Sequence, residues 1–268
     1  MNTFTVERAT FASLPDAYAL HPDRADAERR LAQFRERMAA GKVSPEQFVL
    51  LRSGRGAEAV TLVSDNPHVP LFSRSRADTP HAGLTQFYAF LREAEPGRTL
   101  VLDSILNVFD PAPALAAGWR LDDAQVTYET DLTARTWTPA PDAHEDGAEL
   151  LERPDIAALL AELGQADLEL DEGWHLAALL DDEGQPAALG AFGPSGRPDW
   201  ASINLIGVRG AARRQGLGTR LHAHLLARAA REFGWHVGRT EAENTAMRRI
   251  FARSGCEVRG EQLYFRTS

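Results

Sequence analysis

The sequence contains a single cysteine and a single lysine. Because Cys256 is the only thiol, an internal disulfide is excluded. A chain without disulfides suits a reducing compartment, so we expect a cytoplasmic protein. The chain has 28 arginines but only one lysine, Lys42. We interpret this ratio as a result of genome composition rather than as a functional signal.

Long hydrophobic runs and an excess of basic residues are also missing. No apolar stretch approaches the roughly 20 residues of a membrane span, and the polar N-terminus lacks the apolar core of a signal peptide. The net charge is -9, whereas proteins that bind nucleic acids need basic surface. We therefore expect neither a membrane nor a nucleic acid as partner.

The charge is unevenly distributed along this acidic chain. Residues 141–184 contain 14 acidic side chains and one arginine, whereas residues 185–268 contain 13 arginines and 6 acidic residues. The last segment is therefore positive by 7. Two interpretations stay open: helix faces with solvated charges, or a local site for an anion.

The length and an internal similarity indicate two domains. A chain of 268 residues is long enough for two domains of roughly 100–150 residues each. Gly118 precedes Tyr128 by ten residues and Gly255 precedes Tyr264 by nine, in segments that resemble each other. The Pro- and Asp-rich stretch WTPAPDAHEDG reads as the junction. We predict domains at 1–134 and 135–268.

Both halves predict alternating strands and helices in the same order. Apolar runs around glycines predict hairpins at 46–65 and 174–193, and a helix followed by a strand comes after each hairpin. Residues 119–132 are predicted to form two closing strands. The sequence thus predicts an α/β fold in each half.

The segment RRQGLG at 213–218 stands between an apolar run, INLIGV, and a predicted long helix. The first turn of a helix has N–H groups without intrahelical partners, and its dipole makes this end positive. Gly216 and Gly218 would leave the backbone amides open to a ligand. The loop therefore predicts a phosphate site, although a plain strand-to-helix turn also needs glycine.

With Asn244, Phe251 and Gly255 downstream, this loop resembles the Q/R-x-x-G-x-G/A motif of the GNAT superfamily of N-acetyltransferases. The resemblance covers roughly residues 130–268, and residues 1–130 only by the order of elements. It implies two GNAT-like domains in tandem, each with a mixed, mostly antiparallel sheet flanked by helices. It further implies acetyl-CoA as cosubstrate, no metal, and a set of cofactor-binding residues: Ile206, Gly207, Val208, Arg213, Arg214, Gln215, Gly216, Leu217, Gly218, Thr219, Asn244 and Phe251. Asn244 also suits a helix N-cap, and both roles stay open.

The sequence departs from the family pattern where protons are transferred. The family's usual tyrosine is Phe251 here, which has no proton to donate to a leaving thiolate. The strand ASINLIGV lacks the carboxylate that often serves as general base in the family. The catalytic candidates are Asp199, Asn204 and Tyr264. We interpret His175 and Asp181 as solvated or structural side chains rather than as catalytic ones.

The first half is predicted to be a degenerate domain that does not bind coenzyme A. Its counterpart of RRQGLG is PHAGLT, which lacks the arginines and the second glycine. Paired domains of this kind resemble tandem GNAT proteins of the mycothiol-synthase type. We predict acetyl transfer from acetyl-CoA to a primary amine of a small molecule or peptide. A non-catalytic acyl-CoA-binding protein and an unrelated α/β protein remain alternatives, and a homodimer stays open.

Overall fold

The computed structural model describes residues 3–106, 108–146 and 148–267. It contains two compact units: unit 1 is Met1–Gln125 with Gly260–Ser268, and unit 2 is Val126–Arg259. The predicted domain boundary after residue 134 divides the chain into its two sequence repeats. Each compact unit contains strand residues from both repeats, so this boundary stays a prediction.

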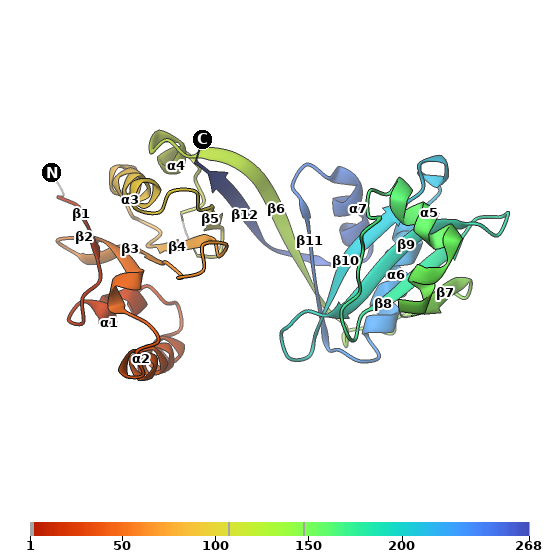
Figure 1. The fold of residues 1–268 in the computed structure, drawn as a ribbon, viewed down its shortest axis with the longest axis horizontal. Helices are drawn as coiled ribbons and strands as arrows, with labels where there is room; N and C mark the ends of the chain where they lie inside the picture. Colours follow the sequence, from red (N-terminus) through yellow and green to blue (C-terminus); the bar gives the residue numbers. More distant parts are fainter. Residues whose placement is uncertain (1–2, 107, 147, 268) are drawn as a thin grey trace. The chain divides into compact units, whose positions relative to one another are not determined.

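Unit 1 is a sheet with helices on both faces (Figure 1). Its strands follow the order β1-β2-β3-β4-β5-β12, in which β4 and β5 run parallel. The elements are β1 (Thr5–Arg8), α1 (Leu14–Tyr18), α2 (Arg24–Ala39), η1 (Pro45–Gln47), β2 (Phe48–Ser53), β3 (Gly56–Leu62), β4 (Leu71–Ser75), α3 (His81–Ala94), β5 (Leu100–Asp103), α4 (Ala112–Ala116), the start of β6 (Arg120–Asp131) and the end of β12 (Glu257–Arg266).

Alternating side chains on the central strands create the two layers of unit 1. Along β2, Phe48 and Leu50 pack with α1 and α2, whereas Val49 and Leu51 pack with α3. Successive side chains of a strand point to opposite faces, so a continuous apolar run such as FVLL is buried on both faces of the sheet. This explains why the first strand of the predicted hairpin begins with a continuous apolar run.

Unit 2 repeats this arrangement with the strand order β6-β11-β10-β9-β8-β7. Helix α6 packs on one face of the sheet, and α5 packs on the other. The elements are β7 (Ala143–Asp146), η2 (Ala148–Glu152), α5 (Pro154–Glu162), β8 (His175–Leu180), β9 (Pro186–Pro194), β10 (Trp200–Val208), η3 (Gly210–Ala212), α6 (Leu217–Ala229), β11 (Trp235–Glu241) and α7 (Thr245–Arg253). The expected fold class is confirmed: each unit is a mixed, mostly antiparallel sheet flanked by helices.

The two repeats exchange their last strands. The second repeat ends in β12, whose residues Gln262–Phe265 pair with β5 in unit 1. The first repeat ends in β6, which lies beside β11 in unit 2. Side chains follow the exchange: Phe265 belongs to the core of unit 1, and Tyr128 to the core of unit 2. Each core is therefore completed by the other half of the sequence.

Two of the sequence-based predictions about elements are wrong. Residues 119–132 contain one long strand, β6, instead of two. No glycine or proline interrupts the run LDDAQVTYETD. The junction at 137–147 contains β7, which pairs with β8 from Ala143 to Asp146. This edge strand is polar, so its sequence resembles a linker.

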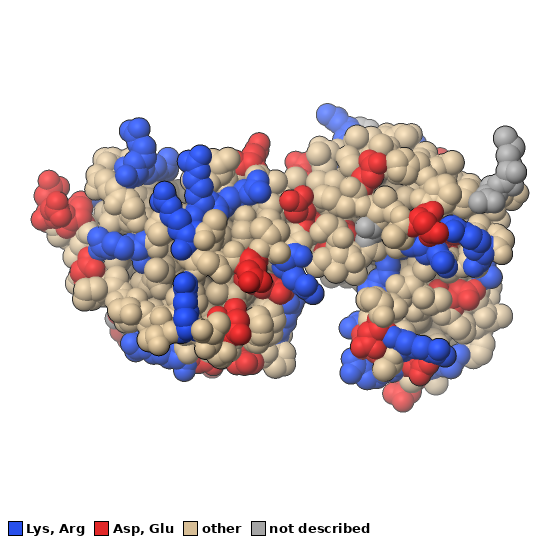
Figure 2. Space-filling model, turned by 180° about the vertical axis from the view of Figure 1, so that it is seen from behind, with Lys and Arg blue, Asp and Glu red and all other residues tan. Residues whose placement is uncertain are grey.

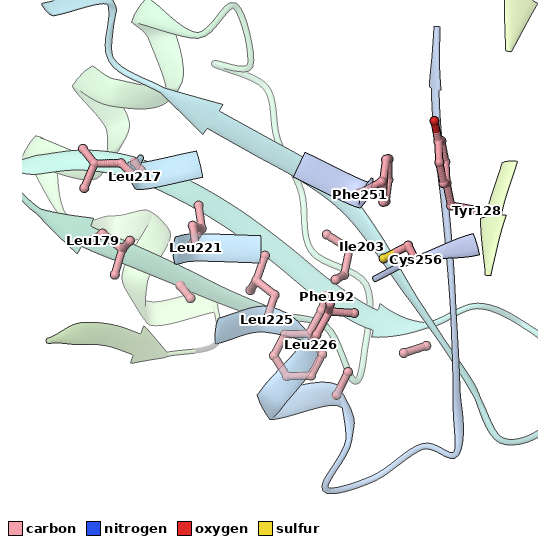
Figure 3. Close-up of a cluster of buried hydrophobic side chains, with 14 of the residues drawn as sticks. Tyr128, Leu179, Phe192, Ile203, Leu217, Leu221, Leu225, Leu226, Phe251 and Cys256 are labelled. Carbon is pink, nitrogen blue, oxygen red and sulfur yellow. The ribbon is translucent and has the colours of Figure 1, made fainter. Parts of the chain in front are cut away.

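The core of unit 2 lies between α6 and the sheet. Leu221, Leu225 and Leu226 on α6 are fully buried against apolar side chains of β8, β9 and β10 (Figure 3). The spacing of these residues places them on one face of the helix. This packing fixes the beginning of α6 relative to the end of β10, where the loop RRQGLG lies. No helix within the described ranges is both long and apolar enough to cross a bilayer.

Candidate functional site

The parallel strands β10 and β11 separate after three residues. Trp200, Ala201 and Ser202 pair with residues 235–237, and the described register of the two strands ends there. On its other side β10 stays paired with β9 as far as Val208, with an irregularity between Ile203 and Leu205. A bulge of this kind bends a strand and interrupts a ladder. The separation leaves backbone groups of β10 open on the side of β11.

The loop after β10 presents a row of free backbone amides. Gly216 is the N-cap of α6 and has a left-handed conformation with φ 84°, which glycine adopts without strain. The first intrahelical bond runs from the Arg220 amide to the Gly216 carbonyl. The amides of the six residues 214–219 have no acceptor among the described residues. An anion at this helix end would meet these donors and the positive end of the helix dipole.

A cavity of about 890 Å³ connects this loop with the gap between β10 and β11. Pockets for small molecules and cofactors commonly have about 300–1,000 Å³. Five arginines line the cavity, and no aspartate, glutamate, histidine, tyrosine or cysteine does so among the described residues. Figure 2 shows arginine side chains gathered on a face of unit 2. The lining therefore suits a ligand with several negative charges. The five arginines are Arg213, Arg214, Arg239, Arg249 and Arg253.

The structure brings nearly all predicted cofactor-binding residues together at this cavity. Gln215 is the exception, since its exposed side chain does not line the cavity. Arg213 donates from Nε to the Val208 carbonyl at 3.2 Å, so this arginine also closes the loop. The lining residues among the predicted set are Ile206, Gly207, Val208, Arg213, Arg214, Gly216, Leu217, Gly218, Thr219, Asn244 and Phe251.

The three catalytic candidates lie in different places. Asn204 lines the cavity at the irregular point of β10, and its Oδ1 accepts a hydrogen bond of 2.6 Å from the Ser202 hydroxyl. Asp199 has a positive φ of 64°, and its Oδ1 accepts from the Gly234 amide at 2.7 Å. Its carboxylate thus holds the turn before β11. Tyr264 belongs to unit 1, where its hydroxyl donates to Gln262 at 2.8 Å.

Phe251 forms part of the cavity wall and is itself almost fully buried. Its ring stacks on Tyr128 with centroids 4.3 Å apart (Figure 3). It also meets the His222 ring edge-on, with centroids 5.1 Å apart. The wall is therefore rigid and apolar at this point. Tyr128 was named in the comparison of the two repeats but was not expected at this site, because it comes from the first repeat.

Sequence reasoning also missed three arginines of the cavity. Arg239 lies on β11, and Arg249 and Arg253 lie on α7. These three side chains have no ion-pair or hydrogen-bond partner among the described residues. The surplus of arginine in residues 185–268 was the available signal, but only the fold shows which arginines face one cavity. Within the same residues, no group of three or more His, Cys, Asp and Glu could hold a metal ion.

Asn244 caps α7, and this gives a test of its two possible roles. Its Oδ1 accepts from the Met247 amide at 3.0 Å. We expect Asn244→Ala to lower the free energy of unfolding by about 1 kcal/mol, because the cap is lost. Asn244→Ser should keep the cap and the stability, as measured by urea denaturation. If Asn244 also binds coenzyme A, the serine variant should bind it several-fold more weakly; unchanged affinity would leave only the capping role.

The equivalent loop of unit 1 has fewer free amides. Its helix α3 has Pro80 as N-cap, which has no N–H, and the amides of Gly83 and Leu84 both donate to the Pro80 carbonyl. No arginine lies between Asp78 and Gln86. Unit 1 thus lacks the row of open donors that unit 2 has.

Residues 133–256 match the acetyltransferase (GNAT) family. A GCN5-related N-acetyltransferase from Sphaerobacter thermophilus is similar in structure, with a TM-score of 0.56, 17% identity and coverage of 98% of this chain and 94% of the other. An acetyltransferase of the GNAT family from Colwellia psychrerythraea has a TM-score of 0.53 and 14% identity, with coverage of 99% and 100%. No curated protein matches by sequence. Residues 133–256 therefore form a domain of the GNAT acetyltransferase family, and the preceding repeat of the same elements lacks the arginine-rich loop.

Proposed function

We propose that the protein transfers an acetyl group from acetyl-CoA to a primary amine, and that unit 2 does this in a ternary complex. The observation that carries the proposal is the row of six unpaired amides at residues 214–219 beside an arginine-lined cavity without acidic residues. Family membership supports acyl transfer in general. That acetyl-CoA is the cosubstrate and a primary amine the acceptor goes beyond this general support and is our proposal.

The cavity suits coenzyme A in its charge and in the open backbone groups that border it. The pyrophosphate would accept hydrogen bonds from the loop amides of 214–219, and the free arginines of α7, Arg249 and Arg253, are available for the remaining phosphate. The pantetheine arm contains amides of its own. These would pair with the open backbone groups of β10 near Ile206 and Val208, where the β10–β11 ladder is missing.

The reaction that we propose is direct attack of a neutral amine on the thioester carbonyl. The nitrogen forms the new C–N bond, the C–S bond breaks, and the thiolate takes up a proton while the nitrogen loses one. Asn204 lies where β10 and β11 separate and could position the carbonyl or the amine by a hydrogen bond. Water is the proton carrier that the proposal requires, since the described lining residues include no acid, histidine, tyrosine or cysteine.

A non-catalytic acyl-CoA-binding protein is the second candidate. The buried Phe251 in place of a tyrosine, and the lack of ionisable proton donors in the lining other than arginine, favour it. The two candidates share the binding site, and they differ only in whether acetyl groups are transferred. Both suit a cytoplasmic protein, as does the single buried thiol of Cys256.

Calorimetric titration with coenzyme A should give one equivalent per chain, because only the loop of unit 2 offers free amides and arginines. Two equivalents would contradict the predicted difference between the units. Thiol release from acetyl-CoA in the presence of a panel of amines then separates the two candidates. Turnover well above the uncatalysed rate excludes the binding protein, whereas binding without turnover for every amine excludes the enzyme.

A further inference from the structure

A second cavity of about 390 Å³ adjoins the first where β10 and β11 separate. Ile203, Asn204 and Arg239 line both cavities. The second cavity also includes Ser202 and Val237, which form the last pair of the parallel ladder. A molecule in this cavity therefore lies next to the inner end of the proposed coenzyme A site.

The side chains of the second cavity are polar and basic. Arg197, from the turn before β10, and Arg239, from β11, both line it, together with Ser195 and Ser202. No acidic residue lines it among the described residues. A guanidinium group donates hydrogen bonds in a planar fork that fits a carboxylate or a phosphate group of a ligand.

Nearby acids neutralise this charge only in part. Glu129 lies 3.7 Å from Arg197, but its other oxygen lies 3.5 Å from Arg259, so two arginines share one carboxylate. Arg239 has no partner among the described residues. The nearest acids in sequence, Asp199 and Glu241, do not line the cavity, and Asp199 is held by the Gly234 amide. The cavity thus keeps a net positive charge.

We infer that the acceptor is a primary amine that also carries a carboxylate or phosphate group, bound by Arg197 and Arg239. This inference rests on the proposed acetyl transfer. The anionic group would occupy the basic second cavity and leave the amine pointing toward Asn204. Positive charge next to an ammonium group favours its neutral form, so the same arginines would help to provide the nucleophile where the lining has no carboxylate base. A polyamine or an aminoglycoside would instead meet repulsion.

Pairs of amines that differ only in the anionic group test this inference. We would compare β-alanine with propylamine and phosphoethanolamine with ethanolamine, using thiol release from acetyl-CoA. We expect kcat/KM for the better anionic amine to exceed that of its partner by about tenfold or more, as a charge-assisted hydrogen bond implies. The two pairs distinguish a carboxylate from a phosphate as the recognised group.

Arg197→Gln should remove this preference, mainly by raising KM for the anionic amine about tenfold, and should leave the affinity for coenzyme A unchanged because Arg197 does not line the first cavity. Arg231→Gln is the matched control: this exposed arginine follows α6 and lines neither cavity. Calorimetric binding of each amine to the coenzyme A complex adds a readout that does not need turnover.

Equal or better use of propylamine, ethanolamine or spermidine would overturn the inference while leaving acetyl transfer intact. The same holds if Arg197→Gln affects charged and uncharged amines alike. Failure of the proposed function looks different, because then coenzyme A itself does not bind, or no amine is acetylated. If coenzyme A binds but neither anionic amine binds to the complex, the inference is also rejected.

Discussion

Replacing Gly218 by glutamate should abolish coenzyme A binding while the protein stays folded. A Cβ at this position would lie 3.0 Å from Ile250 Cδ1 and 3.4 Å from Val208 Cγ2. Both neighbours line the cavity, so a longer side chain would project into it, next to the free amides. Its carboxylate would then compete for the donors that we assign to the pyrophosphate.

The expected loss of affinity is large because two negative charges would meet in a partly buried site. At about 4 Å and an effective dielectric constant of about 20, like charges repel by about 4 kcal/mol. Even half of this energy lowers the affinity by more than tenfold, and the displaced hydrogen bonds add to the loss. We expect calorimetry to show binding weakened by about a hundredfold or more.

Gly218→Gln is the matched control, since glutamine has almost the same size without the charge. It tests the contact with Ile250 Cδ1, which lies at the mobile end of a side chain and can shift. Circular dichroism and the urea midpoint should be alike for the two variants. Affinity that is equal in both would show that bulk rather than charge is decisive, and wild-type affinity in the glutamate variant would reject the site.

Local patterns were sufficient to predict most elements and the side of the cavity formed by β10 and the start of α6. The loop RRQGLG combines a turn that needs Gly216, a helix start and a preceding buried strand, and each of these has a signature within about ten residues. The residues that we propose to bind coenzyme A through backbone groups were predictable for the same reason, since their position follows from the strand and the helix. The polar strand β7 was not predictable, because an edge strand can lack an apolar pattern.

Long-range pairing was beyond the sequence argument. The segments around Tyr128 and Tyr264 resemble each other, and either would suit the place beside β5 or β11. The sequence alone contains nothing that chooses between them, so the exchange of β6 and β12 could not be predicted. The same limit applies to Tyr264, which became a catalytic candidate from its position in the second repeat, although its hydroxyl lies in unit 1.

Two buried histidines should make unit 2 sensitive to acid. His222 on α6 and His236 on β11 are fully buried, with ring centroids 5.8 Å apart. Their Nδ1 atoms lie 2.8 Å from the Ser254 hydroxyl and 3.3 Å from the Thr130 hydroxyl. Neither Nε2 atom has a hydrogen-bond partner among the described residues. A proton added to either ring would therefore be a buried charge without a counterion.

Burial lowers the pKa of His222 to about 4, and burial together with the adjacent His222 lowers the pKa of His236 to about 3. The neighbouring His224, which lies 2.8 Å from Glu145, has a pKa lowered mainly by burial. In the unfolded chain an imidazole has a pKa of about 6.5. Below this pH the unfolded state binds protons that the folded state does not bind, so the free energy of unfolding falls as the pH decreases from about 6.5 toward 4.

Between pH 7.5 and pH 5.0 we expect a loss of about 2 kcal/mol for each of His222 and His236, and hence of about 4 kcal/mol together. This is a substantial part of a typical total of about 5–15 kcal/mol. Urea denaturation followed by tryptophan fluorescence measures it, since four of the five tryptophans, Trp137, Trp174, Trp200 and Trp235, belong to unit 2. His236→Leu should reduce the difference between the two pH values by about 2 kcal/mol, whereas His144→Gln, on the exposed side of β7, should leave it unchanged. A free energy of unfolding that is the same at both pH values would mean that these imidazoles take up protons in the folded protein as readily as in the unfolded chain, and the account of their burial would be wrong.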